Sequence, residues 1–559
     1  MAETELHDSR DRDSHFGKVK WVIVMTLLSR LAGMLRASAI ASLGATALTD
    51  AFSFAWGIPN LFRRLFAEGA MTSAFVPVFT EVQEGPRGRE QANRLLANSM
   101  GILALFLTVL TMLVQAGLLA WGLLAPGPLD RQLFIGLTVV MMPFLVPICL
   151  LAAGSAALNC RDHFLYPAAT PIILNGVIVL GAWFVAPLWK ANPAIQLLVV
   201  AISVTVAGVV QVAGLRGVLR RHGFTPRLRL RPVESGVRPM LRLMGPMLIP
   251  LGFLQFVELM ERVLAWALRA EDGAATISIL GLVLPRPLEV GVLPRLDAAR
   301  YLYQFPMGVL AISLGVVVFP LLARYAARGE MPNFRDSLNR ALRLTLMEGL
   351  ATGVGLFLLA EPIASVLYGH RKFTDLDVHK TAAILRMYVL GMWAYCAYQV
   401  LLRSFYALKE NLTPLKISCA LAPLDFLLVA TLVWIPGLGA GAFGLATSIV
   451  FSVNVIILAV LLRRKLGRIG GRKLLASVLR SLAACAAMAA AIYALGLDPK
   501  WSLLAGRSNW LIVGVCVPAG AGVFFAAAWL LRAPELGELF GTLGRKRKNE
   551  PPPGNDKMD

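Results

Sequence analysis

Long runs of hydrophobic residues, separated by short polar segments, recur along the chain from Trp21 to Leu531. Each run approaches or exceeds about 20 residues, the length that an α-helix needs to cross the hydrocarbon core of a bilayer. The pattern predicts fourteen membrane-spanning helices. Their approximate extents are 19–44, 50–81, 95–125, 132–158, 164–188, 193–219, 239–269, 299–325, 336–368, 378–408, 412–435, 440–463, 473–495 and 508–532.

Composition supports this interpretation. Hydrophobic residues make up 57% of the 559-residue chain and charged residues only 16%, whereas soluble proteins carry about 25% charge. We therefore expect an all-α polytopic membrane protein. The first hydrophobic run contains Arg30 and Arg36 and has no small-residue cleavage site, so we interpret it as a span that is kept rather than a signal peptide.

The basic residues lie in alternate loops. Residues 216–242 contain eight arginines and 463–473 contain six Lys or Arg, whereas 44–50 and 435–440 contain none. The positive-inside rule then predicts that both termini are cytoplasmic. This distribution also argues against nucleic acid as the reason for the net charge of +21. For the basic linker itself, a solvated topology signal and binding to anionic lipid headgroups both remain open.

Two pairs of prolines indicate an internal repeat. Pro77 and Pro320 are separated by the same number of residues as Pro171 and Pro414, which pairs the second span with the eighth and the fifth with the eleventh. We expect two six-helix lobes related by a pseudo-two-fold axis along the membrane normal. The predicted parts are a cytoplasmic tail (1–18), an N-lobe (19–220), a basic linker (221–238), a C-lobe (239–463), two further spans (473–532) and a cytoplasmic tail (533–559).

Charged residues within the first two spans are the main functional signal. Each costs about 2.5–3.5 kcal/mol at mid-bilayer on insertion scales, so we expect these side chains to face an interior. Arg64 and Glu68 have the i,i+4 spacing of a helical ion pair, and Pro59 favours a kink nearby. The set consists of Arg30, Arg36, Asp50, Arg63, Arg64 and Glu68.

The two carboxylates in that set can neutralise only two of the four arginines. The arrangement favours an anion-binding central cavity over a purely structural salt-bridged interface. Arginine suits phosphate because its planar guanidinium makes bidentate hydrogen bonds and stays charged. In the second lobe, Glu258, Glu261 and Asp425 could hold a coupling cation or relay protons, and ion pairing with Arg262 is the alternative.

Several segments resemble the MurJ/MviN family, which comprises lipid II flippases of the multidrug/oligosaccharidyl-lipid/polysaccharide exporter superfamily. The resemblance runs through the first twelve spans, and the second-span block is its most specific part. The segments are "SRLAGMLR" (29–36), "TDAFSFAWGIPNLFRRLFAEGAMTSAFVPVF" (49–79), "YQFPMGVLAISLGVVVFPLLAR" (303–324) and "YGHRKFTDLD" with "TPLKI" (368–417).

This resemblance implies fourteen helices, in two lobes and a C-terminal pair, that move undecaprenyl-pyrophosphate-linked peptidoglycan precursor to the periplasmic leaflet by alternating access. It places the family's cavity arginines on Arg30, Arg36 and one or both of Arg63 and Arg64, and its acidic residues on Asp50 and Glu68. Two positions depart from the family pattern. Ala37 replaces an acidic residue, and Tyr301 holds an arginine position, with Arg300 displaced by one residue. Arg300 is therefore a further candidate for substrate binding.

We expect a transporter rather than an enzyme, in the bacterial inner membrane, with no cofactor except a sodium ion or proton as coupling ion. By location, Thr447 joins Glu258, Glu261 and Asp425 as a candidate for that ion. The expected partners are the lipid-linked precursor, membrane lipids and, in addition, cell-wall synthesis or division proteins. An exporter of another polyprenyl-linked glycan and an inactive scaffold of the same fold remain alternatives.

Overall fold

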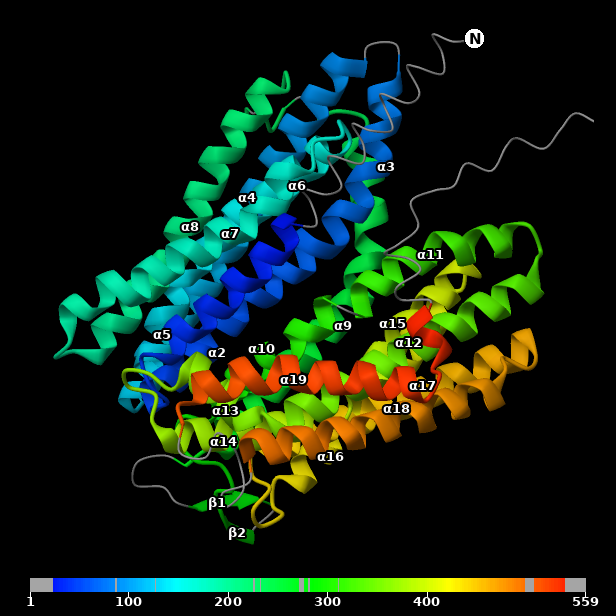
Figure 1. Ribbon diagram of the computed structural model, residues 1–559. Helices are drawn as coiled ribbons and strands as arrows, with labels where there is room; N and C mark the ends of the chain where they lie inside the picture. Colours follow the sequence, from blue (N-terminus) through cyan, green and yellow to red (C-terminus); the bar gives the residue numbers. More distant parts are fainter. Residues whose placement is uncertain are drawn as a thin grey trace, which may run out of the picture. The chain divides into compact units, whose positions relative to one another are not determined.

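The structure is a computed structural model that describes residues 24–85, 88–125, 127–224, 227–231, 233–270, 276–279, 282–309, 311–497 and 507–537. Within these ranges the chain is almost entirely helical, as the hydrophobic pattern predicts. Figure 1 shows the long helices α4 (Gly88–Leu124), α6 (Leu145–Asn159), α7 (Leu165–Leu180) and α8 (Pro193–Arg221) running side by side.

A first helix spans Val24–Ala41. It is followed by α2 (Ala47–Phe62), η1 (Arg63–Ala70), α3 (Met71–Glu84), α4, α5 (Leu129–Met141), η2 (Met142–Phe144), α6, α7, η3 (Gly181–Val185), η4 (Ala186–Trp189) and α8. After the basic linker come α9 (Val237–Leu268), β1 (Thr276–Ile279), β2 (Leu282–Pro285), α10 (Val292–Val309), α11 (Ala311–Ala327), α12 (Met331–Leu358), α13 (Ala360–Tyr368), α14 (Asp375–Val389), α15 (Met392–Ala407), α16 (Leu412–Leu432), α17 (Gly441–Leu466), α18 (Gly471–Ile492), η5 (Tyr493–Leu497) and α19 (Asn509–Leu530).

Every hydrophobic run of the sequence falls on one or more of these helices. Among the described residues, ten helices are long and apolar enough to cross a membrane. The predicted spans outside that set are 50–81, 239–269, 299–325 and 378–408, which are helical but interrupted or charged. The polytopic all-α class is confirmed, and the count of fourteen stays a prediction that fits the helices.

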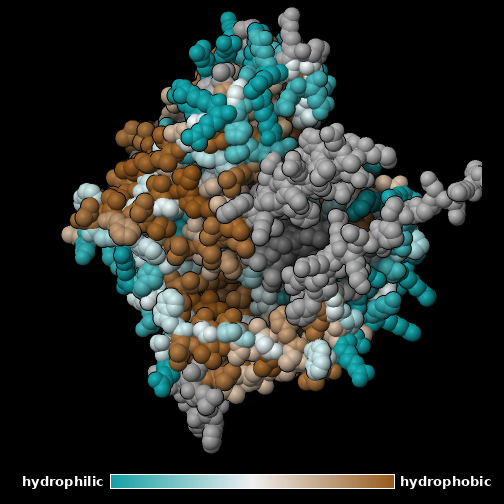
Figure 2. Space-filling view, turned by 45° about the horizontal axis from the view of Figure 1, so that its top comes forward, coloured by the Kyte–Doolittle hydropathy of each residue, from teal (hydrophilic) through white to brown (hydrophobic). Residues whose placement is uncertain are grey.

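The surface supports a bilayer location. On the face in Figure 2, hydrophobic residues cover a broad continuous area and hydrophilic residues gather at its upper edge. Large apolar side chains such as Leu113, Phe184 and Leu188 are more than half exposed. Soluble monomers rarely expose so much apolar surface, whereas lipid solvates it.

The second span contains a change of helix type at its charged residues. Helix α2 passes through Pro59 and ends at Phe62, and the segment Arg63–Ala70 is a π-helix. Proline has no N–H to donate, so the helix loses one hydrogen bond at this point. π-Helical turns are rare and often occur at functional sites. The changed period also alters which side chains share a face, so the i,i+4 spacing of Arg64 and Glu68 no longer predicts that they pair.

The loop before α10 carries a small addition to the all-α fold. Strands β1 and β2 pair antiparallel, with Thr276 opposite Pro285 and Ile279 opposite Leu282. The segment between α9 and α10 therefore contains a short hairpin.

The chain divides into two compact units. Unit 1 comprises Met1–Phe305, Ile363–Tyr388 and Leu415–Val450, and unit 2 comprises Pro306–Pro362, Val389–Pro414 and Phe451–Asp559. Every candidate site residue predicted from the sequence, including Asp425 and Thr447 of the later spans, belongs to unit 1. The division into an N-lobe and a C-lobe stays a prediction.

Candidate functional site

Arg36 is a buried cation of unit 1 that lies near two aromatic rings. Its side chain is only 9% exposed, and its Nη2 donates a hydrogen bond of 2.7 Å to the Tyr301 hydroxyl. The guanidinium carbon lies 5.5 Å from the Trp56 ring centre and 5.4 Å from that of Tyr301. Its Nε is buried, and the described residues include no hydrogen-bond partner for it. A buried N–H without a partner costs about 1–3 kcal/mol, which an acceptor on a ligand would relieve.

Arg30 and Arg63 are two further candidate anion ligands from the same two spans. Arg30 is half-buried on the same helix as Arg36. Arg63 is the first residue of η1, and its Nε donates to Asn60 Oδ1 at 3.0 Å. Within the described parts of the chain, no carboxylate contacts Arg30 or Arg36. No ion pair among the described residues therefore neutralises Arg30 or Arg36.

Arg64 forms an ion pair with Glu258 of α9, and the predicted pair of Arg64 with Glu68 lies outside what the structure describes. Both side chains keep about a third of their surface exposed. Glu68 lies in η1, and its side chain is among those that the structure does not describe. The pair joins the second span to the seventh, which are far apart in sequence.

Arg262 crosses from α9 to α2 and α10. It makes two hydrogen bonds to the Asp297 carboxylate, of 3.3 and 2.8 Å, and a third of 3.0 Å to the Ser53 carbonyl. The side chain passes directly over Gly57, where an added Cβ would lie 2.8 Å from Arg262 Cδ. Glycine at position 57 therefore makes room for the buried guanidinium.

Arg300 faces the acidic residues of the second lobe. It pairs with Glu261, and its Nε donates a 2.9 Å hydrogen bond to the Tyr388 hydroxyl. Asp425 contacts Glu261 through its carboxyl group, and its buried Oδ1 has no hydrogen-bond partner in the described part of the chain. Thr447 instead donates its hydroxyl to the Phe443 carbonyl of its own helix at 2.8 Å. The structure thus brings Glu261, Arg300 and Asp425 together and gives Thr447 a local partner.

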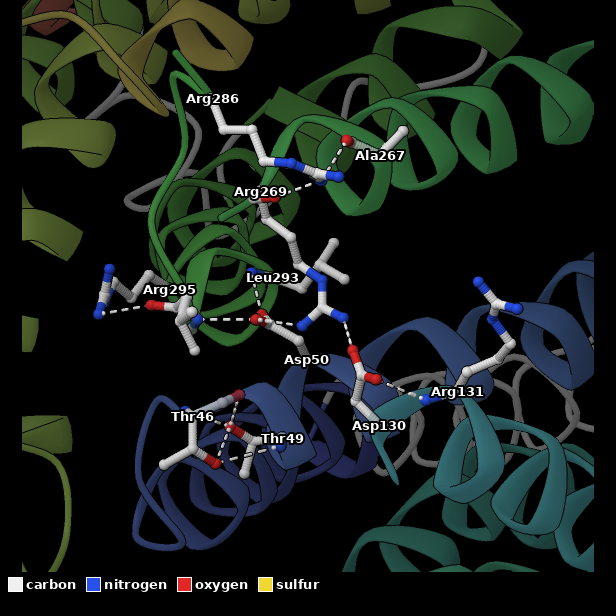
Figure 3. A network of polar contacts seen from close by, with 12 residues as sticks. Thr46, Thr49, Asp50, Asp130, Arg131, Ala267, Arg269, Arg286, Leu293 and Arg295 are labelled. Atoms are coloured by element: carbon white, nitrogen blue, oxygen red, sulfur yellow. Dashed lines mark hydrogen bonds and ion pairs between the residues drawn. The ribbon is translucent and has the colours of Figure 1, made fainter. Parts of the chain in front are cut away.

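Asp50 lies in a separate buried network at one end of unit 1 (Figure 3). Its carboxylate accepts hydrogen bonds from the Gly291 N–H at 2.7 Å and the Leu293 N–H at 2.9 Å. Arg269 lies between the two acids Asp50 and Asp130 and pairs with both. Asp50 is fully buried and Arg269 is 1% exposed. These contacts join the start of α2 to the end of α9, the start of α5 and the start of α10.

Three arginines near this site are paired with carboxylates, and among the described residues two others are not. Arg64, Arg262 and Arg300 pair with Glu258, Asp297 and Glu261 respectively. The acids contributed by α9 and α10 are therefore used by these arginines, and Arg30 and Arg36 have no carboxylate partner in the described ranges. Such an arrangement can bind an anion, and the arginine fork fits phosphate. No group of three His, Cys, Asp or Glu side chains in that part of the chain could hold a metal ion.

The fold is that of a helical transporter. A solved structure titled as an inward-facing multidrug resistance MATE family transporter of the MOP superfamily matches with a TM-score of 0.64 and 13% identity, covering 79% of this chain and 95% of that one. A solved lipid II flippase MurJ in an inward closed conformation matches with a TM-score of 0.71 and 22% identity, over 94% and 99% of the two chains.

The sequence comparisons define the family. The family described as "Lipid II flippase MurJ" matches residues 40–504. A probable lipid II flippase MurJ of Rhizobium tropici is 29% identical over 95% of this chain and 96% of its own length. Another from Bdellovibrio bacteriovorus is 31% identical over 70% of this chain and 72% of its own. The chain belongs to the MurJ family, and it is a multi-pass transporter of the inner membrane.

Sequence reasoning missed three residues of these networks. Asp130 lies between two predicted spans, Arg269 is the last residue of the predicted span 239–269, and Asp297 lies just before the predicted span 299–325. One signal was available for Tyr301, because the departure from the family motif drew attention to it. Its hydroxyl contacts Arg36, whereas Arg300, one position earlier, faces Glu261 and Tyr388.

Proposed function

We propose that this protein is a lipid II flippase, which moves the undecaprenyl-pyrophosphate-linked peptidoglycan precursor from the cytoplasmic to the periplasmic leaflet by alternating access. Both termini would be cytoplasmic. Family membership supports the substrate class. The observation that carries the proposal is the buried Arg36 guanidinium, which has no carboxylate partner among the described residues and an unpaired Nε.

The pyrophosphate would bind to Arg36, with Arg30 and Arg63 contributing from the same two spans. A pyrophosphate offers several charged acceptors, and hydrogen bonds to charged groups contribute about 1.5–3 kcal/mol each. Trp56 and Tyr301 hold the Arg36 side chain between their rings, so little side-chain entropy would be lost on binding. The polyprenyl tail would remain in the lipid.

Asp50 would act on the transport cycle by holding one end of the transporter closed. Alternating access requires contacts that close one end and break when that end opens. The pairs of Arg269 with Asp50 and Asp130, and the bonds from Gly291 and Leu293, are suited to this role because they join four helix ends. In the predicted topology this end is periplasmic.

A cation would bind at Asp425 and Glu261 and couple to the cycle. The two carboxyl groups lie in contact, and Asp425 Oδ1 has no partner. Two adjacent carboxyl groups are stable either with a shared proton or with a bound cation such as sodium. Transport measured with imposed sodium gradients and with imposed proton gradients distinguishes these ions, and Asp425→Asn should remove the dependence on whichever one acts. Contacts with cell-wall synthesis proteins would lie outside this site.

The test is complementation of a bacterium whose own lipid II flippase is depleted. We expect the wild-type chain to restore growth and lipid II translocation, and Arg36→Ala to abolish the rescue at equal membrane abundance. Arg231→Ala, which removes a charge from the exposed linker, is the matched control and should rescue normally. Failure of a well-inserted wild type would favour another polyprenyl-linked glycan or an inactive scaffold. Rescue by Arg36→Ala would contradict the assigned site.

A further inference from the structure

A second cluster of cations lies at the end of unit 1 remote from Asp50, where three helix ends meet. These are the first turn of α4 with Arg89, the turn after α6 with Arg161 and His163, and the end of α8 with His222 and Gly223. The cluster is separate from the arginines of the first two spans, and nothing in the proposed transport step uses it.

Arg161 is fixed in this cluster by two contacts. Its Nη1 donates a hydrogen bond to the His222 carbonyl, and its guanidinium carbon lies 4.0 Å from the centre of the Phe224 ring. Phe224 is 1% exposed and packs against Phe79 with ring centres 6.1 Å apart. The Arg161 side chain is therefore positioned by the packed core beneath it, rather than moving freely in solvent.

Arg89 approaches the same backbone segment from the other side. A Cβ placed on Gly223 would lie 2.4 Å from Arg89 Nη2, so the guanidinium rests against this glycine. Gly223 has a φ of +77°, which ends α8 in the left-handed conformation that glycine adopts readily. The Gly223 carbonyl accepts a 3.2 Å hydrogen bond from Asn93 of α4, which fixes α4 to the end of α8.

The guanidinium groups of Arg89 and Arg161 lie near each other, and neither is paired with a carboxylate among the described residues. In the described ranges, no carboxylate contacts Arg89 or Arg161, and Asp162 is exposed in the turn between Arg161 and His163. Partial burial and the neighbouring charge of Arg89 lower the pKa of Arg161 below its usual value. Two like charges held by packing at one point are stabilised by any anion that bridges them.

The neighbouring histidines complete a donor-rich surface. The His163 and His222 rings lie 4.3 Å apart, centre to centre. His222 Nδ1 lies 3.0 Å from the Val218 carbonyl and donates to it. Phosphate is the anion that this arrangement fits, because two arginine forks can each make paired hydrogen bonds to its oxygens.

We propose that Arg89 and Arg161 form a binding site for a phosphate group, distinct from the transport site. The phosphate belongs either to an anionic phospholipid headgroup at the membrane face or to a soluble phosphate compound. Both sources present the same oxygens, so the experiment below uses one probe for each.

The experiment measures the thermal midpoint of the purified full-length protein in neutral detergent. Dioleoyl phosphatidylglycerol and inorganic phosphate are titrated separately, with dioleoyl phosphatidylcholine and chloride of equal ionic strength as controls. We expect at least one phosphate probe to raise the midpoint of the wild type. A shift with phosphatidylglycerol alone assigns a lipid headgroup, and a shift with inorganic phosphate as well assigns a soluble phosphate compound.

The variants are Arg89→Gln, Arg161→Gln and the control Arg507→Gln, which removes the same charge from an exposed position just before α19, outside the basic linker. Loss of one arginine should raise the half-saturating concentration about tenfold, as expected for one charge-assisted contact. Arg507→Gln should bind as the wild type does. Arg89 is exposed, so its substitution tests the site even if Arg161→Gln impairs folding. An equal effect of all three substitutions, or no shift with either probe, would overturn the proposal, and neither result depends on transport.

Discussion

Asp50→Asn tests whether the buried network at one end of unit 1 holds that end together. The change keeps the size of the side chain and removes its charge. In the native network one carboxylate oxygen accepts from both the Gly291 N–H and Arg269, and the other accepts from the Leu293 N–H (Figure 3). An amide must direct its NH₂ group at one of these donors, which leaves donors facing each other inside a site with no solvent contact.

The expected loss of stability follows from the burial of these side chains. Asp50 is 0% exposed and Arg269 is 1% exposed, so water cannot replace the lost interactions. An unsatisfied buried donor costs about 1–3 kcal/mol, and removal of one partner from a buried ion pair costs about 3–5 kcal/mol. In this variant Arg269 still pairs with Asp130, so the cost of the broken ion pair is smaller than that range. We expect Asp50→Asn to lower the free energy of unfolding by about 2–4 kcal/mol.

The assay is unfolding of the purified protein in mixed micelles, with Asp50→Asn, Arg269→Gln and the double variant compared. Removing both partners leaves fewer unpaired charges than removing one, so the double variant should be less destabilised than the sum of the single variants. Asp130→Asn is the matched control because Asp130 is 12% exposed and water can reach it. Asp130→Asn should lower the free energy of unfolding by less than Asp50→Asn does.

An equal, small effect of Asp50→Asn and Asp130→Asn, below about 1 kcal/mol, would show that burial does not set the cost of losing this carboxylate. Strict additivity of the single substitutions would show that Asp50 and Arg269 do not act together, because residues that share one network should couple.

Three further predictions concern the middle of unit 1 and one of its loops. Gly57→Ala should lower the free energy of unfolding by about 1–3 kcal/mol, measured in the same micelle assay, because the new methyl group overlaps Arg262 Cδ. Tyr301→Phe should cost about 1 kcal/mol and weaken lipid II binding, since Arg36 loses its hydroxyl acceptor. Burial and neighbouring Arg371 lower the pKa of the loop residue His370, so protonation of its ring disfavours the folded state. The thermal midpoint should therefore fall as the pH drops below about 6.5, the ordinary pKa of histidine.

Two of these predictions have direct controls. Gly117→Ala, in α4, adds a methyl group with nothing within 4 Å, and it should leave stability unchanged or raise it. If Gly57→Ala also left stability unchanged, overlap with Arg262 would not restrict the size of the side chain at position 57. His370→Gln should flatten the decline in thermal midpoint between about pH 7 and pH 5, the range in which histidine titrates. An unchanged pH profile in His370→Gln would assign that decline to other groups.

The hydrophobic pattern predicted the helices well because each apolar run forms a helix for reasons that lie within the run itself. Burial in lipid requires a helix that satisfies its own backbone hydrogen bonds, so long apolar runs have a single stable conformation. The described helices accordingly cover all the predicted runs within a few residues at most ends. The hairpin before α10 could not be predicted in this way, since its pairing depends on a loop rather than on a span.

The partners of the charged residues depend on tertiary contacts and could not be predicted from the pattern. Arg64 pairs with Glu258, a residue far away in sequence, because α9 packs beside the π-helical segment that contains Arg64. Arg269 and Asp130 are 139 residues apart in sequence, and the packing of α2 against both α5 and α9 brings them together. A sequence identifies a charge that needs a partner, but the tertiary fold determines which partner it meets.

Translocation in a reconstituted system tests whether Arg36 binds the pyrophosphate of a lipid-linked precursor. The purified protein is placed in liposomes with lipid II, and the appearance of the lipid II headgroup in the opposite leaflet is followed. We expect translocation by the wild type and by Arg231→Ala, and its loss in Arg36→Ala together with at least about tenfold weaker lipid II binding. Translocation by Arg36→Ala at the wild-type rate would contradict the role of Arg36 as the pyrophosphate ligand.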